Sequence, residues 1–166
     1  MTPPLPAMTD ADPALVRRID ALNRAYAHAI DEDVLEEWPG FFAETGAYRI
    51  TTRANHAARM PVGLMLCEGH GMMEDRIKAL REANVFEPHH YRHLVDPPTV
   101  TLARPGRWTV RTNFAVYRTM QMAATALFCT GRYLDVVVEA AAELRYAERI
   151  VVCDAEVIDT LIVIPL

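Results

Sequence analysis

The chain has 166 residues, of which 51% are apolar, and this length and composition suit one globular domain with a core of ordinary size. Its 22 acidic side chains outnumber 17 basic ones and the basic residues are scattered, so a nucleic-acid-binding surface is not expected. No apolar run approaches the roughly 20 residues of a membrane-spanning helix, and the first ten residues lack the basic start and apolar centre of an export signal.

The first predicted element is a helix that follows a proline-rich extension. We expect residues 1–11 to be disordered and residues 12–166 to form a single domain. Asp12 followed by Pro13 predicts the helix start, because aspartate caps a helix and proline suits its first position. Apolar residues then recur at helical spacing as far as Ile30, which predicts that one face of this helix packs on a core.

The next segments are shorter and less regular. A second helix is predicted after Asp31 or Asp33, and it should stop at Pro39-Gly40, because proline lacks the amide hydrogen and glycine relieves backbone strain. Alternation with β-branched residues over 48–52 predicts a strand. The stretch from His56 to Gly63 shows no clear period and is predicted to be a loop.

A third helix is predicted from Gly71 to Ala83, and everything after it has the character of a sheet. Four segments are rich in β-branched and aromatic residues: 91–103, 108–119, 124–138 and 144–153. The second segment has two distinct faces. Its apolar face is formed by Trp108, Val110, Phe114 and Val116, and its polar face by Thr109, Arg111, Asn113 and Tyr117. Helices followed by antiparallel hairpins predict an α+β fold.

Several stretches of this sequence together resemble one protein family. They include Trp38-Pro-Gly-Phe-Phe42, the helix 75–82, Tyr91-Arg-His-Leu94 and the strand 148–154. These stretches, and the order in which they follow one another, resemble the small (beta) subunit of aromatic-ring-hydroxylating dioxygenases. The resemblance implies an NTF2-like fold, shared with SnoaL and ketosteroid isomerase, in which N-terminal helices pack in a strongly curved, mostly antiparallel sheet that forms a cone.

The resemblance also implies a function by association. The small subunit would be a non-catalytic, structural part of a bacterial cytoplasmic complex, commonly α3β3, in which the small subunits form a trimeric core. The large subunit would hold a Rieske [2Fe-2S] cluster and a mononuclear Fe(II), and would form a cis-dihydrodiol from an aromatic carboxylate. A separate reductase would deliver electrons from NADPH or NADH. Candidate contacts to the partner are polar residues of the sheet: Arg92, His93, Arg111, Asn113, Tyr117, Arg145 and Arg149. Arg149 could instead pair with an acid inside the fold.

The cysteines do not offer an obvious metal site. A Rieske cluster takes two cysteines and two histidines. None of the three cysteines, Cys67, Cys129 and Cys153, is expected to belong to a Cys-x-His or Cys-x-x-His element that chelates a cluster, or to a Cys-x-x-Cys pair. We expect them to be buried thiols in a reducing cytosol. No catalytic, cofactor-binding or metal-binding residue is therefore expected on this chain.

A histidine cluster is the strongest candidate against that expectation. His89, His90, His93 and Asp96 are dense in metal-ligand types, and strand alternation would put His89 and His93 on one face. Histidine in a half-buried strand usually satisfies neighbouring backbone or carboxylate groups. We therefore interpret this cluster as structural or interfacial, with metal binding as the weaker alternative.

A stand-alone isomerase or dehydratase is the alternative function, because the same fold hosts such enzymes. Tyr26, Asp31, Tyr48 and His93 could supply the acid, base and oxyanion donor of that chemistry. Tyr26 also completes the apolar stripe of the first helix, and Asp31 is equally well placed as a helix cap. The structural interpretation of both residues is preferred, since a fold alone does not confer an activity.

Overall fold

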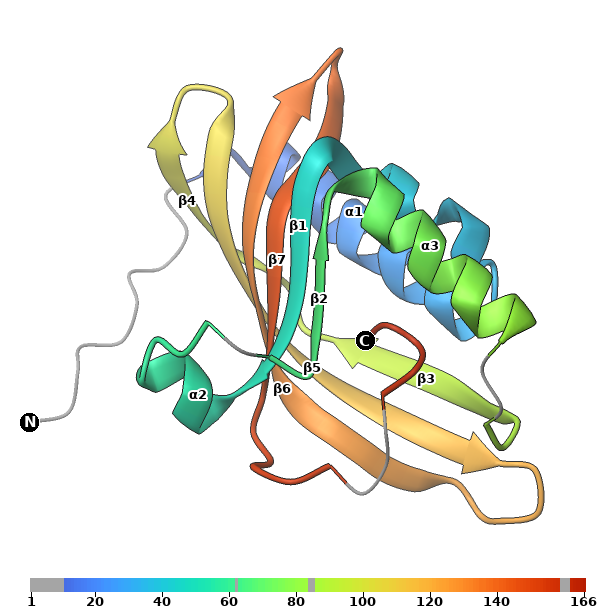
Figure 1. Ribbon diagram of the computed structural model, residues 1–166. Coiled ribbons are helices and arrows are strands. Elements are labelled where there is room, and N and C mark those ends of the chain that lie inside the picture. The colour runs from blue at the N-terminus through green and yellow to red at the C-terminus, as the bar shows by residue number, and fades with distance from the viewer. Residues whose placement is uncertain (1–10, 62, 84–85, 159–161) are drawn as a thin grey trace, which may run out of the picture.

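The computed structural model of this chain describes residues 11–61, 63–83, 86–158 and 162–166 (Figure 1). The disorder predicted for the N-terminal extension falls, except at residue 11, outside the described residues. The helices are α1 (Pro13–Asp31), the 3-10 helix η1 (Leu35–Phe41), α2 (Arg53–Ala57) and α3 (Gly69–Glu82). The strands are β1 (Phe42–Thr52), β2 (Met65–Glu68), β3 (His89–Val95), β4 (Thr99–Arg104), β5 (Arg107–Met120), β6 (Ala126–Ala140) and β7 (Glu143–Cys153).

All seven strands form one curved sheet in the order β2-β1-β7-β6-β5-β3, and β4 pairs with the remaining part of β5. Every pairing is antiparallel except that of β1 with β7. The sheet bends around α1 and α3, which lie together on its concave side (Figure 1). Within the described part of the chain, no helix is long and apolar enough to cross a membrane.

The predicted α+β class and mostly antiparallel sheet are confirmed, and the differences are local. The predicted strand 91–103 is two strands, because prolines at 97 and 98 separate β3 from β4 and cannot donate to a ladder. The predicted loop contains the short helix α2, and β2 follows it. The second helix is a 3-10 helix that continues past Pro39 to Phe41.

A bulge in β7 decides which of its side chains face the interior. Val136 of β6 pairs with Glu148, and Val137 pairs with Tyr146, so the residue between them is extra and the alternation shifts by one position. Arg145 consequently stays on the half-exposed outer side, whereas Arg149 is fully buried. This corrects the prediction that Arg149 is a surface contact for a partner.

The Arg149 side chain forms the centre of a buried polar network. Its Nε and Nη2 donate to the two carboxylate oxygens of Asp135 at 2.9 and 2.8 Å, and Nη2 also donates to Asn23 Oδ1 at 2.7 Å. Tyr146 donates its hydroxyl to the same Asn23 oxygen at 2.6 Å, and Asn23 Nδ2 donates to Thr112 Oγ1 at 3.0 Å. The network therefore ties α1 to β5, β6 and β7.

Three tyrosine rings enclose the same guanidinium. Its Cζ atom lies 4.2, 4.1 and 4.0 Å from the ring centroids of Tyr26, Tyr133 and Tyr146. A cation over an aromatic face is attracted by the ring quadrupole, and this attraction is larger where water is excluded. Burial raises the pKa of the three phenols, so their hydroxyls remain protonated around the charge.

Asp135→Ala should destabilise the protein strongly, because it leaves the positive charge of Arg149 buried without a counter-ion. We expect the free energy of unfolding to fall by about 3–5 kcal/mol, measured by urea denaturation. Arg18→Ala is the control, since it breaks the exposed Arg18–Glu139 ion pair and should cost less than about 1 kcal/mol. Equal losses in the two variants would contradict the role given to this network.

Candidate functional site

The interior of the cone is occupied by the end of the chain itself. Tyr26 and Tyr48 both donate their hydroxyls to the main-chain oxygen of Leu166, at 2.9 and 3.0 Å. The Leu166 amide donates back to the Tyr48 hydroxyl at 2.8 Å, and Trp38 Nε1 donates to the Tyr26 hydroxyl at 3.3 Å. Two phenols that could have bound a substrate oxygen thus both donate to Leu166.

The segment 162–166 fills the surrounding space with apolar side chains. Leu166 is fully buried, and Ile162, Val163 and Ile164 are each less than a tenth exposed. Arg76 anchors the start of the segment, since its Nη2 donates to the main-chain oxygen of Ile162 at 3.0 Å. The C-terminal end of the chain accordingly lies inside the curve of the sheet, between β2 and β3 (Figure 1).

Asp31 and His93 form a separate buried pair. Asp31, at the end of α1, accepts from the backbone N–H of His93 at 2.9 Å and lies 2.6 Å from its Nδ1. The two side chains are 1% and 0% exposed, so the pair joins α1 to β3 in the interior. His93 therefore does not reach the surface, which corrects its prediction as a partner contact.

The four residues of the isomerase hypothesis are thus not gathered around an open cavity. Tyr26 and Tyr48 bind Leu166, whereas Asp31 and His93 bind each other, and no hydrogen bond joins the two pairs in the described part of the chain. Burial raises the pKa of both phenols, so each keeps the proton that it donates. The isomerase or dehydratase alternative is not favoured.

The histidine cluster does not converge on a metal. His89 and His93 share the inward face of β3, as predicted, but the Tyr91 ring lies between them, with centroids at 5.0 and 6.2 Å. His90 is exposed, and Asp96 accepts a hydrogen bond from Asn113 at 3.1 Å. The described residues contain no group of three histidine, cysteine, aspartate or glutamate side chains that could hold a metal ion.

The cysteines are unsuited to a Rieske cluster. All three are free and buried. Cys67 and His70 do stand in a Cys-x-x-His spacing, which corrects the expectation that no such element is present. However, Cys67 faces the core from β2, and His70 Nε2 lies 3.0 Å from the main-chain oxygen of Phe42. The donor set of this chain therefore does not fit the cluster.

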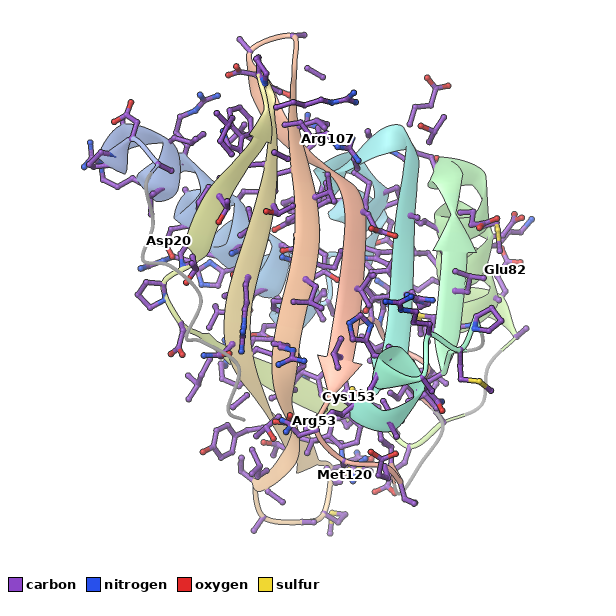
Figure 2. All side chains as sticks on the ribbon, turned by 90° about the vertical axis from the view of Figure 1, so that its left-hand side faces the viewer. Asp20, Arg53, Glu82, Arg107, Met120 and Cys153 are labelled. Carbon is purple, nitrogen blue, oxygen red and sulfur yellow. The ribbon has the colours of Figure 1, made fainter. Side chains whose placement is uncertain are left out.

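The remaining partner candidates lie on the outer face of the sheet, which Figure 2 shows. Arg92 of β3 pairs in register with Tyr117 of β5, and the Arg92 side chain is 62% exposed with a contact to Glu32 at 3.2 Å. Arg111 and Asn113 are exposed farther along β5. Arg145 lies on the outer side of β7, beside the carboxylate of Glu143.

An apolar patch on this face was not predicted from the sequence. Leu94 and Leu127 are each 56% exposed, and Tyr117 is 37% exposed. Tyr117 pairs in register with Leu127, and the neighbouring Ala115 pairs with Leu94, so the three side chains occupy adjacent strands. Exposed apolar groups on neighbouring strands are typical of an interaction surface.

Comparison with known proteins identifies relatives of this chain. Residues 25–160 match the protein family described as ring hydroxylating beta subunit. The beta 1 subunit of the terephthalate 1,2-dioxygenase terminal oxygenase component from Comamonas sp is 41% identical, over 90% of this chain and 97% of that protein. The small subunit of anthranilate 1,2-dioxygenase from Burkholderia cepacia is 32% identical, over 87% of this chain and 90% of that protein.

Solved structures agree with this assignment. The beta subunit of a proposed aromatic-ring-hydroxylating dioxygenase from Novosphingobium aromaticivorans superposes with a TM-score of 0.84 and 28% identity, over 92% of this chain and 97% of that one. A proposed scytalone dehydratase from the same organism gives a TM-score of 0.67 at 13% identity, over 86% of this chain and 85% of that one. The second likeness shows the shared NTF2-like fold alone.

Tyr48→Phe should loosen the segment 162–166, because it removes both hydrogen bonds between Tyr48 and Leu166 and leaves the buried Leu166 N–H without an acceptor. We expect the free energy of unfolding to fall by about 1–3 kcal/mol in urea denaturation. Tyr117→Phe, which removes a hydroxyl from a partly exposed ring, should change it by less than about 0.5 kcal/mol. If Tyr48→Phe left the free energy of unfolding unchanged, other contacts would be shown to hold the segment.

Proposed function

The chain belongs to the family of ring-hydroxylating beta subunits, and we propose that it is the non-catalytic, structural small subunit of a dioxygenase that oxidises an aromatic carboxylate. Two relatives that cover most of this chain support the substrate class, since they are named for terephthalate and for anthranilate. Terephthalate is the proposed substrate, because its oxygenase subunit is 41% identical. The observation that carries the structural role is the cone filled by residues 162–166.

The proposed partner is a large subunit that carries the redox centres. We place the Rieske [2Fe-2S] cluster and the mononuclear Fe(II) on that subunit, because the described residues of this chain offer no suitable ligand set. A separate reductase would supply electrons from NADPH or NADH, and the large subunit would carry out the cis-dihydroxylation. The proposed assembly is α3β3, with the small subunits as a trimeric core. Three buried, unpaired thiols suit the reducing cytoplasm of a bacterium.

The outer sheet face is the proposed contact surface. Its apolar patch of Leu94, Tyr117 and Leu127 would form the dry centre, with Arg92 and Asn113 at the edge. Arg111 and Arg145 would extend the polar rim. A permanent interface of this kind buries on the order of 2,000 Å² or more, and aromatic and arginine side chains dominate its energy. By burying that area, the small subunit would hold the large subunit in one geometry.

Coexpression with a large subunit tests the division of roles. The complex should contain iron and acid-labile sulfide and should convert terephthalate to a cis-dihydrodiol when a reductase and NADH are added. The purified small subunit should contain neither in stoichiometric amount and should show no turnover under the same conditions. Oxygenase activity or stoichiometric iron on the lone chain would disprove the proposed function.

Leu127→Asp tests the contact surface, because it places a carboxylate in the centre of the apolar patch. We expect the amount of large subunit that co-purifies with the small subunit to fall about tenfold or more, since an uncompensated charge is costly to bury. Leu102→Asp is the matched control, because Leu102 is 61% exposed on β4 at the other end of β5. A larger effect of Leu102→Asp would place the interface elsewhere.

A further inference from the structure

A pocket on the outer face of the sheet gathers three arginines from separate elements. It has a volume of about 260 Å³ and is lined by Arg53 of α2, Arg111 of β5 and Arg132 of β6, together with Asp154 after β7. Figure 2 shows Arg53 beside the end of β7 at Cys153, on the face turned away from the large helices. Three guanidinium groups and one carboxylate leave the pocket with two uncompensated positive charges.

The register of β5 and β6 fixes two of these charges close together. Asn113 pairs directly with Arg132, and Arg111 pairs with Leu134, so both arginines project from the same face at diagonal positions. Like charges on neighbouring positions of a sheet are destabilising. Burial, and then repulsion from Arg111 and Arg53, lowers the pKa of Arg132. The fold therefore holds two cations together at an energetic cost.

The one carboxylate in the pocket is already engaged. Asp154 pairs with Arg53, accepts from Thr130 Oγ1 at 3.0 Å, and donates its own N–H to the Thr130 carbonyl at 2.8 Å. Hydrogen bonds from Arg53 and Thr130 outweigh burial and lower the pKa of Asp154, so it stays ionised in that position. Its carboxylate thus forms an ion pair with Arg53, and it also attracts the more distant guanidinium of Arg132.

Arg111 and Arg132 have no carboxylate partner in the part of the chain that the structure describes. The Nε atom of Arg132 is buried and has no hydrogen-bond acceptor there. A buried N–H without an acceptor costs free energy comparable to a lost hydrogen bond, and a charged donor costs more. This N–H lies beside a cavity with excess positive charge, so the pocket offers a charged donor to an anion.

We propose that this pocket binds an oxyanion, a carboxylate or phosphate group, between the guanidinium groups of Arg111 and Arg132. Arginine forks bind such groups through parallel N–H···O bonds. The amide of Asn113 lies beside them, and it already donates one N–H to Asp96 at 3.1 Å. The oxyanion comes from one of two sources, a free small molecule or an acidic side chain of the large subunit. The second source rests on the proposed function, whereas the first does not.

Thermal unfolding of the isolated chain tests the free oxyanion. Inorganic phosphate and benzoate are the probes, compared with chloride at equal ionic strength. A free anion should raise Tm saturably by about 2–4 °C, as expected for stabilisation near 1 kcal/mol in a chain of this size. The double variant Arg111→Gln/Arg132→Gln should lose this shift, whereas Arg17→Gln, an exposed arginine of α1, should keep it.

Assembly of the complex tests the acidic side chain. If the partner supplies the oxyanion, the double variant should bind the large subunit about tenfold more weakly, and this binding should no longer depend on salt concentration. The Arg17→Gln variant should assemble normally. Phosphate should leave the Tm of the isolated wild-type chain unchanged. Normal assembly of the double variant, combined with no anion-dependent Tm shift in the wild-type chain, would overturn the proposal. Iron on the lone chain would instead disprove the proposed function and leave the phosphate result standing.

Discussion

The guanidinium of Arg149 sits in the centre of the fold, and the elements around it are arranged to satisfy one permanent positive charge. Asp135 neutralises it with two hydrogen bonds, Asn23 accepts a third, and three tyrosine rings exclude water from it. A buried ion pair adds little net stability compared with apolar packing, but removing one partner is costly. The network therefore constrains how α1 can lie against the sheet.

The same constraint bears on function, because polar groups inside this cone serve the fold. Tyr26 contributes its ring to the Arg149 cage and its hydroxyl to Leu166, so a single side chain links the charged network to the segment 162–166. Asp31 contacts the Nδ1 and the backbone N–H of His93 at the junction of α1 and β3. The residue types that other proteins of this fold can use in catalysis are here engaged in intramolecular bonds.

The outer face of the sheet presents the opposite situation. It exposes apolar side chains on three adjacent strands and, beside them, two arginines without a counter-ion in the described part of the chain. Both features cost free energy in the isolated subunit, and a partner that covered this face would relieve both. The interior is filled, whereas the outer face exposes apolar side chains and arginines without a counter-ion among the described residues. This combination suits a subunit that functions by association.

Local pattern in the sequence was sufficient for the α+β order, the extent of α1, the hairpins of β5 to β7 and the two faces of β5, because each depends on periodicity within one element. The family resemblance also came from the sequence. The sequence could not show that the Arg149 side chain points into the core, because a bulge of one residue in β7 reverses the direction of every later side chain. Nor could it show that Tyr26 and Tyr48 meet Leu166, which is 140 and 118 residues away along the chain. Contacts at such separation are set by how the whole sheet closes around the helices, and only the tertiary structure determines that.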